Sequence, residues 1–295
     1  MLNDGEFVAG NFRFPLDRVH LMGILNVNDD SFCGDGSLDG KELLKQACRL
    51  VEEGAVILDI GGESARTNRG PISEAEEIRR VVPLIQSLHT EFPNVPLSLN
   101  TWRPAVAEAG LAAGAVILND MGGLSDDTNA RIAAKHGAGL VIMHLRGKPK
   151  QPQIHATYDD VVAEVREFFL EKIALAQSAG IPKSQLLLDP GLDFAKQRED
   201  NLRVLRQLNE LAGLGCALLL AASRKTFIGE ILGLSPVKRD WGTLAASLWA
   251  MEQGVQFLRV HNVGIHRDAV KVWEAARRGT GFDAVRSTQY TIRIR

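Results

Sequence analysis

The stretch LSLNTWRP, residues 97–104, contains the unit that decides the fold. Its leucines alternate with Ser98, as in a short strand, and a helical pattern begins at Arg103, next to Pro104. Asn100 puts a polar side chain at the carboxyl end of this otherwise apolar strand. The stretch therefore predicts a strand followed at once by a helix, with a polar residue near the junction.

The same strand-and-helix unit recurs eight times along the chain. We expect strands at 20–25, 55–60, 96–99, 115–118, 139–143, 186–189, 217–222 and 257–260. We expect helices at 40–53, 73–90, 103–113, 126–136, 158–179, 200–212, 242–253 and 264–278. Eight such units predict an α/β fold of the (β/α)₈ TIM barrel type. A doubly wound open sheet is the rival, but it typically carries a glycine fingerprint after its first strand, and none follows 20–25.

The chain divides into an N-terminal segment at 1–17, one barrel domain at 18–279 and a tail at 280–295. The net charge of −2 gives no indication of a nucleic acid or membrane partner. The three cysteines form no CxxC pair, and the first residues lack the basic start and apolar core of a signal peptide. We therefore expect a cytoplasmic protein with reduced thiols.

Polar side chains gather where the expected strands end, and in a barrel these ends form the active site. The strand-end residues include Asn26, Asn100, Asn119, Asp189 and the segments 61–70, 223–226 and 259–262. Any one of them alone is well explained as a helix cap or a turn residue. Their presence at all eight strand ends indicates a functional site.

One subset of these residues is cationic and suits an anionic ligand. Its members are Arg66, Arg224, Lys225, Arg259 and His261. So many hydrogen-bond donors at one barrel mouth predict a phosphate or diphosphate site. Asn26, with Asp29 and Asp30, could help to hold Mg²⁺, which takes few protein ligands beside substrate phosphates.

A second subset is neutral or acidic and suits a flat heterocycle. Its members are Asn100, Asn119, Asp189, Met143 and Phe194. Amide and carboxylate groups bind the polar edge of such a ring, and the last two side chains pack on its face. Neither Ser31 nor Ser223 has evident His–Asp support, and no histidines have zinc spacing. The two subsets together predict displacement of a phosphate leaving group.

Eight motifs then resemble the dihydropteroate synthase family, in that family's order, over residues 18–278. They are GILNV…DSF, DIGGES.R, the S…T of the third strand, ND, MH..G, DPG..F, SRK and RVH. The resemblance implies a (β/α)₈ barrel that condenses 6-hydroxymethyl-7,8-dihydropterin diphosphate with 4-aminobenzoate in folate biosynthesis. It also implies Mg²⁺ as cofactor and a homodimer.

The resemblance assigns roles to the strand-end residues by position. Lys225, Arg259 and Asn100 are expected to be catalytic. The substrates are expected to contact Asn119, Met143, Asp189, Phe194, Lys225, Arg66, Thr226 and Ser223. The diphosphate is expected at Asn26, Arg259 and His261, with Mg²⁺ at Asn26.

The chain also departs from the family. Asn100 stands where the family usually has aspartate, and Asn262 replaces another aspartate. Asp193 and Ala195 replace two glycines, and the loops at 28–32 and 64–68 are altered. Loss of a carboxylate beside a developing cation costs on the order of 3 kcal/mol, about a hundredfold in rate. Asp29, Asp30 or Asp193 could compensate for that loss.

Two alternatives follow from these departures. One is a pterin-binding paralogue in which the condensation is lost or altered. The other is a methyltransferase acting between methyltetrahydrofolate and a corrinoid protein, which the SRK and RVH motifs disfavour because that reaction releases no diphosphate. In the tail, residues 290–295 alternate as in an edge strand, although a frayed terminus fits as well.

Overall fold

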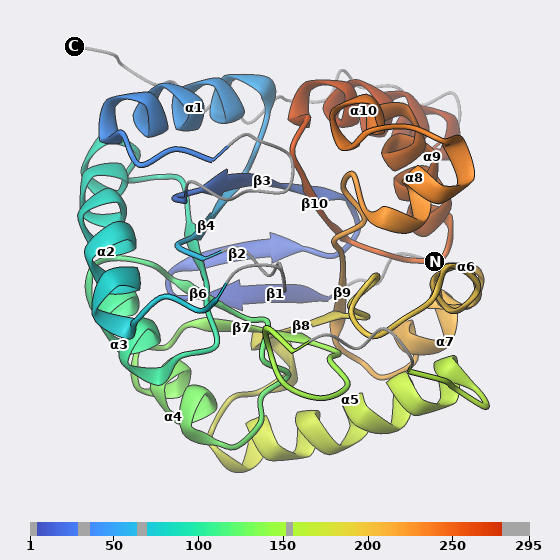
Figure 1. The fold of residues 1–295 in the computed structure, drawn as a ribbon, viewed down its shortest axis with the longest axis horizontal. Helices are drawn as coiled ribbons and strands as arrows, with labels where there is room; N and C mark the ends of the chain where they lie inside the picture. The colour runs from blue at the N-terminus through green and yellow to red at the C-terminus, as the bar shows by residue number, and fades with distance from the viewer. Residues whose placement is uncertain (1–4, 29–35, 64–69, 152–155, 279–295) are drawn as a thin grey trace.

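The expected barrel is confirmed by a computed structural model, which describes residues 5–28, 36–63, 70–151 and 156–278. Figure 1 shows the barrel strands at the centre with helices around them. Eight parallel strands close in the order β3 to β10. They are β3 His20–Asn26, β4 Ile57–Gly61, β5 Leu97–Asn100, β6 Ile117–Asp120, β7 Gly139–Met143, β8 Leu186–Asp189, β9 Ala217–Leu220 and β10 Phe257–Val260. Each agrees with its predicted position to within two residues at either end.

The helices agree with the prediction except for those that follow β8 and β9. They are α1 Gly40–Glu53, α2 Glu74–Glu91, α3 Pro104–Ala112, α4 Thr128–Lys135, α5 Val161–Ser178, α6 Arg198–Arg206, α7 Leu208–Ala212, α8 Thr226–Leu232, α9 Asp240–Glu252 and α10 Val263–Arg278. Short 3₁₀ turns occupy Lys183–Gln185 and Pro236–Lys238. The single helix expected at 200–212 is interrupted at Gln207, whose φ of −122° is not helical. Helix α8 was not predicted, because its seven residues are too few for a clear helical period.

Side chains alternate between the two faces of each barrel strand, and this period of two separates two cores. Outward side chains such as Leu58, Leu99 and Leu118 pack under the helices. Inward side chains at the lower ends of the strands form a separate apolar layer. That layer includes Met22, Ile57, Ile117, Val141, Leu187, Leu219 and Phe257. The next inward position on each strand lies above this layer, toward the carboxyl ends.

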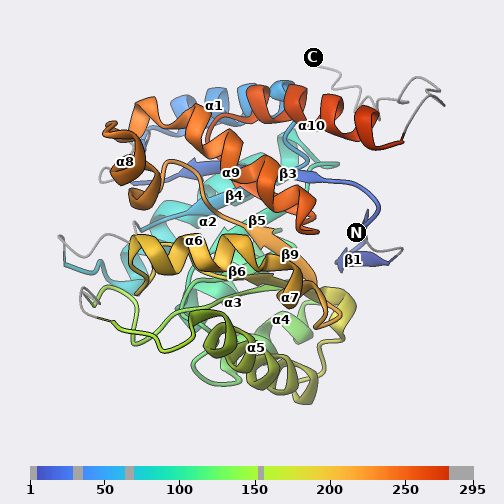
Figure 2. The ribbon, with the colours of Figure 1, turned by 90° about the vertical axis from the view of Figure 1, so that its right-hand side faces the viewer.

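An N-terminal hairpin, which the sequence did not reveal, seals the lower end of the barrel. Strands β1 Glu6–Ala9 and β2 Phe12–Pro15 pair antiparallel, and Figure 2 shows β1 at one end of the barrel. The rings of Phe7 and Phe14 lie 5.4 and 5.8 Å from that of Phe257. Gly139 makes room for this plug, since a Cβ there would lie 2.5 Å from the Phe7 ring. Any ligand of the barrel must therefore enter from the opposite end.

None of the helices that the structure describes is both long and apolar enough to cross a bilayer.

The plug also buries His20 in a neutral state. Its Nε2 lies 2.7 Å from the Pro15 carbonyl oxygen, and its ring centroid lies 4.9 Å from that of Phe257. Burial lowers the pKa of His20 to about 4. Protonation therefore favours the unfolded chain, in which a histidine has a pKa of about 6.5.

We predict that lowering the pH from 7.5 to 5 removes about 2 kcal/mol of unfolding free energy through His20 alone. The unfolded state takes up a proton as the pH falls below about 6.5, whereas folded His20 stays neutral down to about pH 4. Urea unfolding at both pH values measures the loss. His20→Gln should lose about 2 kcal/mol less than the parent over this range, and an identical loss in both proteins would contradict the assignment.

Candidate active site

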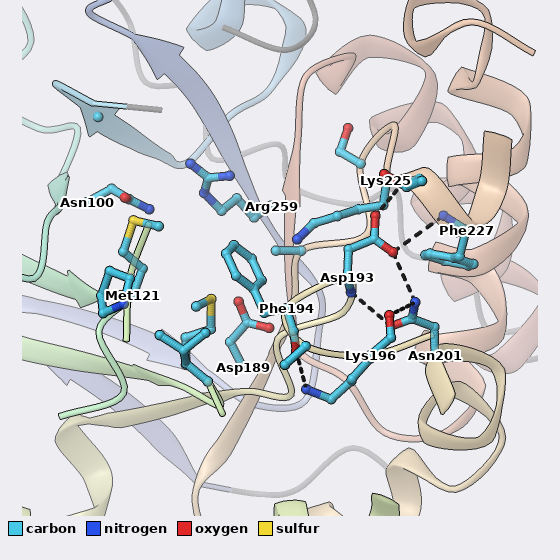
Figure 3. A pocket seen from close by; sticks show the side chains of 18 of the residues that line it. Asn100, Met121, Asp189, Asp193, Phe194, Lys196, Asn201, Lys225, Phe227 and Arg259 are labelled. Atoms are coloured by element: carbon cyan, nitrogen blue, oxygen red, sulfur yellow. Dashed lines mark hydrogen bonds between the residues drawn. The ribbon is translucent and has the colours of Figure 1, made fainter. Parts of the chain in front are cut away.

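A cavity of about 750 Å³ opens at the carboxyl ends of the barrel strands. Its floor consists of inward residues that lie two positions after the apolar layer on the same strand, as Asn119 follows Ile117 and Asp189 follows Leu187. Among the described residues that line it are all the predicted site residues on β3 to β10: Asn26, Asn100, Asn119, Met143, Asp189 and Arg259. Phe194, Ser223, Lys225, Thr226 and His261 line it from the loops and from α8. Figure 3 shows several of these side chains around one space.

The Asp59 carboxylate belongs to the same level of inward residues, two positions after Ile57, and is fully buried. Its Oδ1 accepts hydrogen bonds from Ser98 Oγ at 2.5 Å and from Asn119 Nδ2 at 3.1 Å. Its Oδ2 accepts from Arg259 Nε at 2.6 Å. One carboxylate thus joins β4 to β5, β6 and β10. Sequence reasoning did not single out Asp59, although an acid inside the apolar run AVILDI was a usable signal.

Asn100 and Asn119 lie side by side, since they are partners in the β5–β6 register. The bonds from Asn119 Nδ2 to Asp59 fix the orientation of that buried amide. Asn100 is half-buried and lines the cavity as predicted. The two amides therefore form one wall of the cavity.

Asp189, Phe194 and Lys225 form a second wall. Lys225 Nζ donates to the Leu192 carbonyl at 2.7 Å and lies 4.2 Å from the centroid of the Phe194 ring. Burial raises the pKa of Asp189, against the opposing effects of Lys225 and Arg259. Burial lowers the pKa of Lys225, and the carboxylates of Asp193 and Asp189 oppose that shift. Each charge in this wall thus depends on an opposite charge nearby.

Lys196, which the sequence analysis did not single out, holds the loop after β8 in place. Its Nζ lies 2.7 Å from His144 Nδ1 and donates to the carbonyl oxygens of Gly191 at 3.1 Å and Phe194 at 3.2 Å. Burial lowers the pKa of Lys196 to about 7 and, together with Lys196, lowers that of His144 to about 2. His144 is therefore neutral and accepts the bond from Lys196.

Ser223 contacts a histidine, contrary to our expectation that it has no such support. Ser223 Oγ lies 2.7 Å from His261 Nδ1, and the His261 backbone N–H donates to the same oxygen at 3.2 Å. The two residues follow neighbouring strands, β9 and β10, which the sequence could not reveal. When Ser223 donates to Nδ1, the neutral ring carries its proton on Nε2. We therefore interpret Ser223 as a residue that orients His261.

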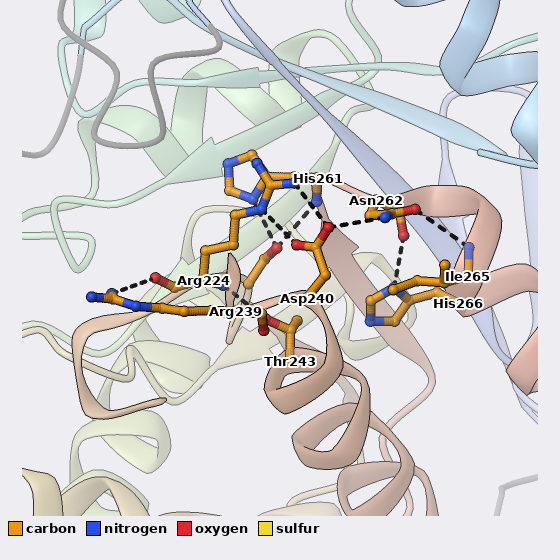
Figure 4. A network of polar contacts seen from close by, with 9 residues as sticks. Arg224, Arg239, Asp240, Thr243, His261, Asn262, Ile265 and His266 are labelled. Carbon is orange, nitrogen blue, oxygen red and sulfur yellow. Dashed lines mark hydrogen bonds and ion pairs between the residues drawn. The ribbon is translucent and has the colours of Figure 1, made fainter. Parts of the chain in front are cut away.

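Arg224 was wrongly predicted to belong to the cationic subset at the barrel mouth. Its Nε and Nη2 donate to the two carboxylate oxygens of Asp240 at 2.6 and 3.0 Å (Figure 4), and it is not among the residues that line the cavity. Asn262 Nδ2 also donates to Asp240, at 2.9 Å. An aspartate at 262 would instead place a second carboxylate against Asp240. The departure at Asn262 thus belongs to this network.

Asp193 does not supply the charge missing at Asn100. Figure 3 shows the two residues on different sides of the cavity, with Phe194 between them. The Asp193 carboxylate accepts hydrogen bonds from the backbone N–H groups of Thr226 and Phe227 instead. The other two candidates for compensation, Asp29 and Asp30, lie outside the described residues, as do Arg66, Ser31 and the tail.

Within the part of the chain that the structure describes, no three His, Cys, Asp or Glu side chains are grouped to hold a metal ion. Asn26, the predicted magnesium ligand, lines the cavity together with Arg259 and His261. A single amide oxygen beside a phosphate ligand is compatible with magnesium, which retains several waters.

This chain is similar to proteins of one family. A family model described as "Pterin binding enzyme" matches residues 22–261. A dihydropteroate synthase of Synechocystis sp. is 41% identical over 261 residues, 88% of this chain and 90% of the relative. The Yersinia pestis dihydropteroate synthase solved with a sulfonamide drug complex gives a TM-score of 0.88 at 38% identity, over 92% of this chain and 99% of that chain. The Thermus thermophilus enzyme in complex with 4-aminobenzoate gives 0.82 at 40% identity, over 91% and 98%.

We predict that Asp59→Ala lowers the free energy of unfolding by about 3–5 kcal/mol, because it leaves Arg259 and Asn119 without their buried acceptor. Urea unfolding measures the loss. The control is Asp17→Ala, which breaks the exposed Asp17–Arg18 pair and should cost less than about 1 kcal/mol. Equal effects of the two substitutions would show that Asp59 does not hold the strands together.

Proposed function

The chain belongs to the pterin binding enzyme family and is a transferase of the dihydropteroate synthase type, and we propose that one part of its cavity, the pterin half, binds the pterin ring and another part, the diphosphate half, binds the leaving diphosphate. The reaction condenses 6-hydroxymethyl-7,8-dihydropterin diphosphate with 4-aminobenzoate and releases 7,8-dihydropteroate and diphosphate. The observation that carries the division is that the cavity lining combines these two walls with Arg259, which Asp59 fixes, and with His261 and Asn26.

In the pterin half, Asn119, Asp189 and Lys225 bind the polar edge of the ring, with Asn100 beside them. A carboxylate accepts two N–H groups at once, as the amino-pyrimidine edge of a pterin offers them. Lys225 and Arg259 favour the charged form of Asp189 in spite of its burial, which supports this role. Met143 and Phe194 pack on the ring faces, and Lys196 holds the Phe194 loop in position.

In the diphosphate half, Arg259, His261 and Asn26 bind the leaving group. The Arg259 guanidinium is fixed through Nε by Asp59, so its remaining donors are already oriented before the substrate arrives. A magnesium ion held by Asn26 would add positive charge against the diphosphate oxygens. We also propose Arg66, Lys225 and Thr226 as neighbours of the aminobenzoate, with Ser223 acting through His261.

The bond changes follow from this division. The bond between the methylene carbon and the diphosphate oxygen breaks, and its electron pair leaves with the diphosphate. The lone pair of the aryl amine then forms the new C–N bond, and the amine loses one proton. Positive charge develops on the pterin methylene during the first step, and it is stabilised by any negative group nearby.

The folded protein should release diphosphate when it is incubated with the pterin diphosphate, 4-aminobenzoate and Mg²⁺. A coupled assay for diphosphate follows the release over time. A sample that binds pterin but releases no diphosphate above background would favour the paralogue without condensation activity.

We predict that Asn100→Asp raises kcat by about ten- to a hundredfold, since a carboxylate there faces the developing cation. The assay is diphosphate release at saturating substrates. Asn209→Asp, an equal charge change at an exposed position of α7, is the control and should leave kcat unchanged. An unaltered kcat in Asn100→Asp would contradict the idea that the missing charge limits the rate.

We further propose that two copies of the chain form a dimer through an apolar surface on α8 and α9. This α8–α9 patch consists of Ile231, Leu232, Leu234, Val237 and Trp241, whose exposed fractions reach 73% at Trp241. Five large exposed apolar side chains within residues 231–241 suggest an association surface. Neighbouring residues of the same segment, Glu230, Pro236 and Arg239, line the cavity, so the patch adjoins the cavity in the chain.

Trp241→Glu should convert the dimer to a monomer, because it puts a charge at the most exposed side chain of the α8–α9 patch. Sedimentation velocity over a range of protein concentrations measures the mass. Val272→Glu, an equally exposed position on α10, should leave the dimer intact. A monomeric parent protein, or dissociation by both substitutions alike, would refute the proposed interface.

A further inference from the structure

Lys225 stands at a turn of the backbone that the first turn of α9 holds. The turn directly precedes α8, and Arg224 within it has a φ of 59°, a conformation that residues other than glycine rarely adopt. The Arg224 backbone N–H donates to Oγ1 of the buried Thr243 at 2.9 Å, and its side chain pairs with Asp240. A backbone conformation of this kind persists only where several contacts fix it.

Arg239, the N-cap residue of α9, makes three further bonds to the backbone around α8. Its Nη1 donates to the carbonyl oxygens of Arg224 at 3.0 Å (Figure 4) and of Lys225 at 3.1 Å. Its Nε donates to the Leu234 carbonyl oxygen at 2.8 Å. Since Lys225 precedes α8 and Leu234 follows it, one guanidinium is bonded to the chain on both sides of this helix. The sequence analysis did not single out Arg239.

Gly229, the middle residue of α8, makes room for this guanidinium. A Cβ on Gly229 would lie 2.2 Å from both Cζ and Nη2 of Arg239. Glycine is among the least favourable residues in a helix interior, so its presence in the middle of a seven-residue helix needs a reason. The close approach of the Arg239 side chain supplies that reason.

The turn decides where the Lys225 ammonium lies. Its Nζ donates to the Leu192 carbonyl at 2.7 Å and lies 4.2 Å from the centroid of the Phe194 ring. A lysine side chain is a flexible four-carbon stem, so its charge has a defined position only where the backbone that carries it is held. Arg239 also lines the cavity, but its Nε and Nη1 are bonded to backbone carbonyls. These bonds tie Arg239 to the backbone of Lys225.

We propose that Arg239 is a positioning residue for Lys225, and that Gly229 provides the space in which the guanidinium lies. The inference rests on the proposed function, in which Lys225 binds the polar edge of the pterin ring. Without Arg239, the carbonyls of Arg224 and Lys225 lose a donor, the turn relaxes, and the ammonium is no longer held at the pterin site. The effect of Arg239 on the substrate thus passes through Lys225.

The test is a double-mutant cycle on the Kd for the pterin diphosphate, measured by isothermal titration calorimetry with Mg²⁺ present. Arg239→Gln should raise Kd roughly tenfold. In a Lys225→Gln background the same substitution should raise Kd less than about twofold, because no ammonium is left to position. Arg203→Gln, at an exposed position of α6, should leave Kd unchanged in both backgrounds. Equal effects of Arg239→Gln in the two backgrounds would show that it acts independently of Lys225, and would overturn the inference.

Gly229→Ala tests the same inference without removing a charge. Alanine favours the helix, but its Cβ displaces the Arg239 guanidinium, so Kd should again rise roughly tenfold. In the Arg239→Gln protein the same substitution should leave Kd unchanged, since the guanidinium is already absent. Urea unfolding shows that each variant is folded.

The outcomes separate the inference from the proposed function. A Gly229→Ala protein that binds the pterin diphosphate as tightly as the parent would overturn the inference alone. A folded parent protein that binds no pterin diphosphate would overturn the proposed function, and the inference with it.

Discussion

The site depends on one buried carboxylate, Asp59, to which three other strands of the barrel are bound. An unpaired charge at this depth would cost several kcal/mol, so the acid must be matched by Arg259, Ser98 and Asn119 together. The same bonds orient Arg259 and Asn119 toward the cavity above. The interaction that stabilises the barrel therefore also prepares two of its proposed ligand-binding side chains, and it does so without a ligand.

Because the barrel is closed, the strands that Asp59 joins surround one common cavity. Because inward positions recur every second residue, each strand except β5, which has Ser98 at that level, offers one apolar residue to the lower layer and a further residue to the cavity floor. The hairpin with Phe7 and Phe14 closes the lower end and leaves a single open end. Loop residues complete the site, since Phe194 and Lys225 form a wall of the cavity. Lys196 holds this wall through the Phe194 carbonyl, and Asp193 holds it through the N–H of Thr226.

Much of this could be predicted from the sequence, and the failures have definite physical causes. The eight strands and the polar residues at their ends were predictable because strand periodicity and strand termini are local properties. The pairing of Arg224 with Asp240, and of Ser223 with His261, joins segments distant in sequence, so no local pattern could indicate it. The plug was missed because no helix follows β1 or β2, so they lie outside the repeated strand-and-helix unit on which the prediction rested. Asp59 was overlooked although an acid in an apolar strand demands a partner.

We propose above all that the two walls of the cavity bind the pterin, and that Arg259, His261 and Asn26 beside them bind the diphosphate. A crystal structure with the pterin diphosphate bound tests it most directly. We expect the polar edge of the ring against Asn119 and Asp189, the ring face against Phe194, and the diphosphate against Arg259 and His261. A pterin bound outside this cavity, or one reversed so that its ring edge meets Arg259 and His261, would refute this assignment of the two substrates' groups.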